Sequence, residues 1–428
     1  MEITILGYFA IVLTILFILL RKTDYFLYTA IFFSGFLGSS VINVGLSPIR
    51  PSLFFFGIFF FLSLFKKDFA FQTDKVLLIF FGYCVISLFF PFLYSSAGIE
   101  IMNQRGNYEL LHFSSSNIVH IFNLLIDLLF LSALLRLGDK DKKEKAMRAY
   151  KYGYYAVIAI CFYQLLAFRF SLPFDVLFRQ SPHGNVQGSR LYGPCDEASM
   201  LCYFLVPSII VTMQKEVRTR ADMVAAPLAI AIGVLTESST FLVGCVFMAI
   251  FALPACVRFL TTKHKPTTWG VVLIALGALC AVMLVVNEKI MRLFGMLIAK
   301  LLRENTSGVE RSESMLRVLL VGLKIPTGVG FGSARSKDLL STWMCNVGLV
   351  GMAIYIVFLV RYTVRAHRAG ELKTAAPYLI VVLLMMIAVP EPYNLFVWFL
   401  LYFGYHQATE SSQKKQNAIH MKAVKESQ

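Results

Sequence analysis

The chain has 428 residues, of which 57% are hydrophobic and only 15% are charged, and its mean hydropathy is +0.69. This composition excludes a soluble globule of that length, because too little polar surface is available and bilayer-length apolar runs recur along the chain. The net charge of +15 lies in short basic clusters between those runs rather than on one face of a folded domain, which argues against a nucleic-acid-binding protein and indicates a polytopic membrane protein.

Apolar runs along the chain predict an all-α fold: a polytopic transmembrane helix bundle of about 11–13 spans, forming one integral membrane domain over residues 1–428. No basic residue precedes the first run and no small-residue cleavage site follows it, so we expect an uncleaved span there. Several runs are shorter than the ~20 residues that a crossing needs. The pairs of runs joined by 237–239 and by 390–393 therefore also fit re-entrant hairpins. The runs are 3–20, 25–45, 53–65, 76–95, 118–136, 153–170, 200–213, 224–236, 240–257, 269–287, 345–360, 376–389 and 394–405.

The distribution of Lys and Arg predicts the sidedness of the loops. One alternate set of loops, with the tail 407–428, holds 26 of the 40 basic residues, and the short loops between them hold five. Because short cytoplasmic loops carry the excess of Lys and Arg, the basic set is predicted to be cytoplasmic. The segments 171–199 and 288–344 then face the external side. The basic set consists of 21–24, 66–75, 136–152, 214–222, 258–268, 361–375 and the tail.

The long external segment 288–344 is predicted to contain two short helices. Between Lys289 and Arg303 the basic residues fall within roughly 80° of one another on a helix, and apolar residues occupy the rest. That pattern fits a helix lying in the membrane interface, and it fits equally an ordinary helix packed on the membrane domain. A second helical run is expected over 315–324.

Three glycines at alternate positions follow this second run, in Pro-Thr-Gly-Val-Gly-Phe-Gly-Ser over 326–333. Glycines such as Gly328 and Gly330 let a backbone approach a ligand closely and turn its N–H groups toward an anion. The run is not a nucleotide-binding motif, because no strand precedes it and no Lys-Ser/Thr follows it. A plain tight turn is the alternative.

Residues 190–199 read Arg-Leu-Tyr-Gly-Pro-Cys-Asp-Glu-Ala-Ser and run directly into the apolar run 200–213. An arginine, a turn glycine at Gly193 and an acidic pair thus lie at the predicted mouth of a span. We expect this mouth to be where the protein holds its substrate.

Three further motifs follow in order: Leu-Thr-x-Ser-Ser at 235–239, an arginine (Arg311 or Arg317) before Pro-x-Gly-x-Gly-x-Gly at 326–332, and Asn-Val-Gly-Leu-Val-Gly at 346–351. Together with Arg-Leu-x-Gly-x-x-x-Glu-Ala-Ser at 190–199, they resemble the O-antigen polymerase and ligase superfamily, with Wzy-type polymerases among its members. The resemblance extends by motif over roughly residues 185–360, and the first 150 residues match only in hydropathy.

The resemblance implies a GT-C-like bundle in the bacterial inner membrane and an active site that faces the periplasm. The implied activity is that of a glycosyltransferase, a polysaccharide polymerase whose donor is an undecaprenyl-diphosphate-linked oligosaccharide. A chain-length regulator, or co-polymerase, is an implied partner beside membrane lipid. No cofactor is expected. Since no Asp-x-Asp triplet or His cluster stands in the predicted external segments, the sequence predicts metal-independent chemistry.

A diphosphate leaving group is best held by fixed positive charge, and guanidinium is a permanently charged, bidentate fork. Arg190 and Arg311 are therefore predicted catalytic residues, and Arg317 is predicted to bind substrate behind them. The alternatives are an interfacial anchor at Arg190 and a solvated loop charge at Arg311.

A base must take the proton of the acceptor hydroxyl, and a carboxylate beside apolar surface has a suitably raised pKa. Glu197 fits by position, with helix N-capping as its alternative role. Asp338 and Glu391 are reserves on the same side. Asp127 lies within a predicted span, where a carboxylate is costly; it is either functional or part of a hydrogen-bond network with Asn123.

Aromatic rings on the external side, such as Tyr192, Phe331 and Trp343, are candidates to stack on sugars. The ligase branch usually carries a His-Asn pair where this chain reads Ser-Lys-Asp at 336–338, which favours a polymerase over a ligase. A flippase for polyprenol-linked substrates is the alternative from another class, although we find no internal repeat of the kind that many transporters have.

Overall fold

The computed structural model describes residues 2–44, 47–65, 71–104, 106–178, 190–214, 217–261, 306–390 and 392–409. Within these ranges the protein is mostly helical, as the apolar runs predict. The predicted span 269–287, the basic helix 289–303 and most of the tail 407–428 lie outside the described residues.

The N-terminal part combines short helices with a small sheet, which the all-α prediction missed. The run 25–45 is not one span: α2 ends at Phe32 and passes into a 3-10 turn, buried loop and strand. Serines and glycines from Ser34 to Ser40 fill that loop, and its backbone is satisfied by other segments, for example by Gly38 N donating to Pro194 O at 2.9 Å. The elements are β1 (Glu2–Ile3), α1 (Ile5–Leu19), α2 (Thr23–Phe32), η1 (Phe33–Gly35), β2 (Ile42–Val44), β3 (Ser47–Ile49) and α3 (Pro51–Leu64), and the sheet is antiparallel in the order β1-β2-β3.

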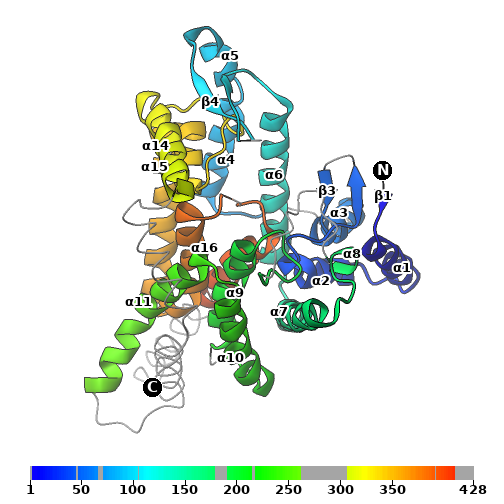
Figure 1. Cartoon of the computed structure of the whole chain (residues 1–428). Helices are drawn as coiled ribbons and strands as arrows, with labels where there is room; N and C mark the ends of the chain where they lie inside the picture. The colour runs from blue at the N-terminus through cyan, green and yellow to red at the C-terminus, as the bar shows by residue number, and fades with distance from the viewer. Residues whose placement is uncertain are drawn as a thin grey trace, which may run out of the picture.

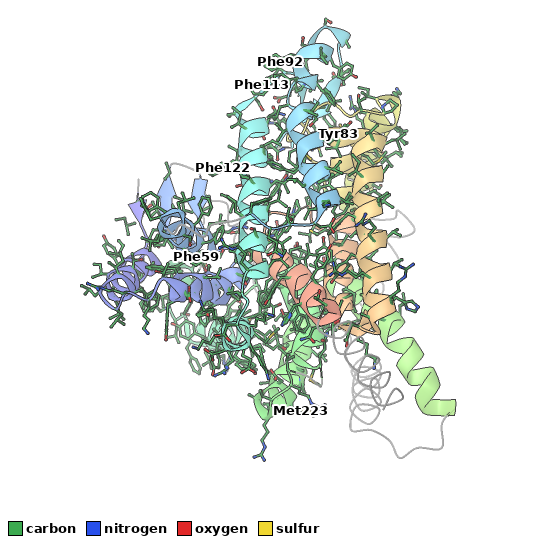
Figure 2. The ribbon with its side chains drawn as sticks, turned by 180° about the vertical axis from the view of Figure 1, so that it is seen from behind. Phe59, Tyr83, Phe92, Phe113, Phe122 and Met223 are labelled. Atoms are coloured by element: carbon green, nitrogen blue, oxygen red, sulfur yellow. The ribbon has the colours of Figure 1, made fainter. Side chains whose placement is uncertain are left out.

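The next part rises to one end of the molecule and returns through the long helix α6 (Figure 1). Helices α4 and α5 are bent by 42° at a short break, so the run 76–95 is kinked. A two-stranded hairpin that the sequence did not predict follows. At this end the ring of Phe92 stacks on that of Phe113 at 4.8 Å (Figure 2). The elements are α4 (Lys75–Ser87), α5 (Phe90–Tyr94), η2 (Ser95–Ala97), β4 (Glu100–Met102), β5 (Tyr108–Leu110) and α6 (Ser115–Leu135).

The rest of the chain is helical, and α9 lies at its centre, in contact with α7, α10, α11 and α16. Tyr150 of α7 stacks on Phe399 at 4.6 Å, and Phe204 of α9 meets Phe396 edge-on at 5.3 Å. These rings form the core. The elements are α7 (Lys140–Phe170), α8 (Asp175–Phe178), α9 (Ala198–Thr212), α10 (Arg220–Leu235), α11 (Ser239–Thr261), α14 (Thr306–Lys324), α15 (Leu339–Ala369), α16 (Leu372–Ile387) and a last helix over 395–409.

Among the described residues, three helices are long and apolar enough to cross a membrane: α6, α7 and α15. The bent pair α4 and α5, counted as one span, makes a fourth. The other apolar helices, such as α1, α3, α9 and α16, have 10–17 residues and are short for a full crossing. The structure therefore supports a helical membrane protein. Large apolar side chains such as Phe122, 59% exposed on α6 (Figure 2), fit a surface in contact with lipid.

Contacts between loops follow the two sets that the basic residues predict. Within the basic set, Lys151 forms a buried ion pair with Asp222, and Gln214 Nε2 donates to Lys373 O at 3.0 Å. Within the opposite set, Arg50 Nη1 donates to Asn394 Oδ1 at 2.5 Å, although the two residues are 344 positions apart. Loops predicted to share one side thus meet one another in space.

Candidate functional site

The stretch 190–199 forms a buried turn at the N-terminal end of α9. The Gln164 side chain of α7 holds this turn, because its Oε1 accepts from Tyr192 N at 3.1 Å and from Gly193 N at 2.7 Å. Gly193 has φ +56°, and a Cβ there would lie 2.7 Å from Cys161 Sγ. Both the backbone conformation and the close approach therefore require glycine.

Arg190 binds the C-terminal end of α10. Its Nε donates to Thr236 O at 3.3 Å and its Nη2 to Glu237 O at 2.9 Å. A guanidinium here satisfies carbonyls that the helix leaves unpaired and complements the negative end of its dipole. Two of the resemblance motifs, at 190–199 and 235–239, are thereby joined through one side chain.

Glu197 occupies the N-cap position of α9, but its side chain makes no cap hydrogen bond. The carboxylate is exposed and accepts from Ser199 Oγ at 3.1 Å. Glu197 is thus the N-cap residue by position, as the capping alternative predicts, although its carboxylate bonds to Ser199 rather than to a backbone N–H of the helix. The apolar surroundings expected for a base are absent from this exposed position, where the carboxylate is open to a substrate from solvent.

The three aromatic rings predicted to stack on sugars are buried. Tyr192 is 3% exposed, and its hydroxyl donates to Asp175 Oδ1 at 2.7 Å. Phe331 and Trp343 are 1% and 4% exposed. These rings are part of the core, so the stacking prediction is wrong for all three.

A second arginine, one of the five basic residues in the short loops predicted to be external, lies near the same mouth. Arg50 precedes α3 and donates to Asn394. Its charge acts on the Cys195 thiol, in the turn before α9, and on the carboxylate of Asp127. Asp127 is 1% exposed, and its Oδ2 has no hydrogen-bond partner in the part of the chain that the structure describes. The hydrogen-bond network with Asn123, one helical turn away, is not observed there.

The glycine run 326–332 packs against a break in α15. Gly348 has φ +61° and ψ −167°, which interrupts that helix. At the break, Val329 N donates to Cys345 O at 2.8 Å and Gly330 N to Asn346 O at 3.0 Å. Gly328 has φ +79°, and a Cβ there would lie 2.5 Å from Asn346 O.

The N–H groups of this run are used by the protein itself. Besides those of Val329 and Gly330, Gly328 N donates to Ile325 O at 2.8 Å and Phe331 N to Ser87 Oγ at 3.0 Å. On the adjoining loop, Tyr83 of α4 donates to Thr327 O at 2.7 Å (Figure 2). The prediction that Gly328 and Gly330 turn their N–H groups toward an anion is therefore wrong in this structure, and close packing explains these glycines.

Arg311 and Arg317 both lie in α14. The Arg311 side chain is outside the described residues. Arg317 pairs with Glu100 of β4 at 2.5 Å, and its guanidinium lies 4.2 Å from the ring centroid of Tyr108 in β5. Helix α14 packs on α15 and β4, on a different flank of the molecule from α9 and α10 (Figure 1). Among the described residues no contact joins α14 to Arg190, and Arg317 is held by Glu100 and Tyr108 rather than placed behind Arg190.

Asp338 caps α15, accepting from Ser341 N at 2.5 Å. Burial raises the pKa of Asp338 above its ordinary value, and hydrogen bonds from Ser341 and Ser336 oppose that rise. The carboxylate is 1% exposed, so it serves the helix end rather than a substrate in this structure. Glu391, the other reserve base, lies outside the described residues.

The raised pKa of Asp338 predicts a specific pH dependence of stability. The folded chain holds this proton more tightly than the unfolded chain, so stability falls as the pH rises from about 4 toward the folded pKa. Asp338→Asn keeps a good N-cap but cannot ionise, so its stability should fall less over pH 4–8, whereas Asp338→Ala should lose about 1 kcal/mol of cap stabilisation. Thermal unfolding of the three proteins across that range checks this, and parallel wild-type and Asn curves would contradict it.

No family model matches the chain, and a search of curated proteins finds no match for it. In the part of the chain that the structure describes, no group of three or more His, Cys, Asp or Glu side chains is arranged to hold a metal ion. The candidate site is thus defined by its own geometry: the mouth of α9, with Arg190 and Arg50 near it and Glu197 exposed at its edge.

Proposed function

We propose that the chain is a membrane glycosyltransferase of the O-antigen polymerase type, with a GT-C-like bundle of 11–13 spans in the bacterial inner membrane. Its donor is an undecaprenyl-diphosphate-linked oligosaccharide, its acceptor is a second lipid-linked repeat unit, and the mouth of α9 faces the periplasm. The chemistry is metal-independent, and a chain-length regulator is a partner.

One observation carries this proposal: Arg190, from the first motif, is anchored on the carbonyls of Thr236 and Glu237, from the second. A guanidinium has five N–H donors, so an arginine fixed through Nε and Nη2 keeps others for a ligand. Arg190 is only half-buried and precedes the N-terminal end of α9 in the chain. A preorganised, permanently charged group of this kind suits a diphosphate.

In the proposed reaction, an acceptor hydroxyl oxygen attacks the anomeric carbon of the donor sugar. The bond from that carbon to the diphosphate oxygen breaks, and its electron pair leaves with the polyprenyl diphosphate. Arg190 stabilises the charge that develops on this oxygen. Glu197 takes the proton of the attacking hydroxyl, since its carboxylate is exposed at the same mouth.

Arg190→Ala is expected to lower the rate of chain elongation about 100-fold, because one preorganised donor to a developing oxyanion is worth that much. Arg190→Lys should retain more activity than alanine but less than wild type, since an ammonium lacks the planar fork. Elongation and release of polyprenyl diphosphate are measured on purified protein with lipid-linked repeat units.

Arg169→Ala is the matched control, because Arg169 ends α7 on the same predicted side and is exposed. It should elongate like wild type. Unchanged elongation by Arg190→Ala would contradict the proposed site. Translocation of the lipid-linked unit without bond formation would instead identify a flippase, and transfer only to lipid A-core would identify a ligase.

A further inference from the structure

A polar cavity of about 260 Å³ lies where the turn between α1 and α2 meets the N-terminal end of α7. Four basic side chains line it, those of Arg21, Lys22, Lys142 and Lys145. All belong to loops that the distribution of Lys and Arg predicts to be cytoplasmic. The cavity is therefore on the opposite side from the mouth of α9 and is separate from the proposed active site.

The charges around the cavity leave a positive surplus. Lys142 pairs with Asp24 at 2.8 Å, and Lys145 pairs with Asp141 at 2.5 Å. Arg21 and Lys22 stand outside these two pairs. Asp139 is the third carboxylate of the lining, and it accepts from the backbone N–H of residue 141 at 3.2 Å. Four cations against three carboxylates give the lining a net charge of +1.

Two helices begin at the cavity. Helix α2 starts after Lys22 without a side-chain cap hydrogen bond, so its N-terminal end adds to the positive potential, whereas the end of α7 is capped by Asp139. The N-terminal ends of helices favour anions. Tyr28 adds a hydroxyl donor to the lining: burial and the carboxylates of Asp24 and Asp141 raise the pKa of Tyr28 to about 12, so the hydroxyl stays protonated.

An apolar surface leads directly to this cavity. Helix α1 lies at the edge of the molecule (Figure 1) and exposes large apolar side chains along its length, including Val12 and Ile15, and ends with Leu19 75% exposed. Arg21 and Lys22 follow at once. Such a change from exposed apolar to basic residues is typical of the boundary between the hydrocarbon and the headgroups of a membrane. Tyrosine is also enriched at this boundary, and Tyr25, beside the basic pair, is 46% exposed.

We propose that this cavity binds the phosphate headgroup of an anionic phospholipid, whose acyl chains lie along the exposed face of α1. Arg21 and Lys22 contact the phosphate beside the N-terminal end of α2, and the pair of Lys142 with Asp24 holds α7 against α2. The site binds a lipid of the surrounding membrane, and this proposal does not depend on the proposed glycosyl transfer.

The test uses the full chain in nanodiscs of phosphatidylcholine with a minor share of phosphatidylglycerol, followed by native mass spectrometry of the lipids retained. Wild type should retain phosphatidylglycerol in preference to phosphatidylcholine. Arg21→Gln with Lys22→Gln should lower this preference about 30-fold, because each basic residue near an anionic surface contributes about 1 kcal/mol. Lys22→Gln alone, at an exposed residue that should not disturb folding, is expected to lower it about fivefold.

The control is Lys140→Gln with Arg148→Gln, which removes the same charge from α7 at exposed residues that do not line the cavity. It should keep the wild-type preference. Equal loss in this control, or no loss in the Arg21 and Lys22 variants, overturns the proposal. Displacement of the lipid by an equal concentration of inorganic phosphate would also overturn it, because the site would then recognise the free anion rather than a lipid.

Discussion

Replacing Gly348 by alanine is expected to destabilise the protein by more than about 3 kcal/mol, since a strained backbone and a steric clash act together. Gly348 has φ +61° and ψ −167°, a conformation that side chains rarely adopt. A Cβ there would lie 2.2 Å from Pro326 O and 2.3 Å from Gly328 N. Both are backbone atoms, so they cannot move aside as a side chain can.

The break at Gly348 also determines how the glycine run is held. It lets Val350 N donate to Pro326 O at 3.1 Å, while the Asn346 side chain exchanges two hydrogen bonds of 2.8 Å with the backbone of Ala334. A Cβ at 348 would push the loop away from these partners. We therefore expect Gly348→Ala to yield little monodisperse protein after detergent extraction, with a lower midpoint of thermal unfolding.

Gly82→Ala is the matched control for this prediction. Gly82 lies in α4, and a Cβ there has no atom within 4 Å. Alanine in a helix interior is favoured over glycine by up to about 1 kcal/mol, so this variant should be as stable as wild type or slightly more. If Gly348→Ala unfolded at the same temperature as Gly82→Ala, the proposed strain at the break would be wrong.

Helix positions were predictable from the sequence because burial in lipid or core imposes long apolar runs. The run 118–136 corresponds to α6 (Ser115–Leu135), and the run 376–389 to α16 (Leu372–Ile387). The run 25–45 was wrongly predicted to be one span, because a buried apolar loop and an apolar helix have the same composition. What ends α2 at Phe32 is a buried loop whose polar groups bond to distant segments, such as Pro194.

The site was predictable in part. The arginine, the glycine turn and the helix start at 190–199 follow from local residue types, and the structure has all three. The carbonyls that Arg190 binds lie 46 and 47 residues away, a pairing that no local pattern encodes. The structural role of the alternating glycines is ambiguous for the same reason. They fit an anion nest or a close helix approach, and only the position of residues 345–348 decides between these.

Arg50 was missed because an arginine between prolines in a short loop resembles an ordinary topology signal. Its partner Asn394 comes from the far end of the chain. Asp127 lies buried in α6, within the apolar run where the sequence places it, and the charge of Arg50 that acts on it comes from another segment. The mouth of α9 is thus formed by long-range contacts, which hydrophobic periodicity and composition do not predict.

Arg50→Ala is expected to cost about 2 kcal/mol of stability, because it removes the hydrogen bond that Arg50 donates to the 3% exposed Asn394. The change also removes a positive charge that acts on the 1% exposed Asp127. Arg317→Ala is the matched control: it breaks an arginine-carboxylate pair whose side chains are 55% and 54% exposed, so it should cost at most about 1 kcal/mol. Thermal and denaturant unfolding measure both.

A double-mutant cycle separates the electrostatic cause from lost packing. Asp127→Asn removes the carboxyl group on which the charge of Arg50 acts, so Arg50→Ala should cost less in that background, with a coupling of about 0.5 kcal/mol or more between the two positions. The same change at Arg50 in wild type should also impair chain elongation, since this side chain lies near the turn before α9. Strict additivity of the two substitutions would mean that Arg50 does not stabilise the Asp127 carboxylate and acts through its bond to Asn394 instead.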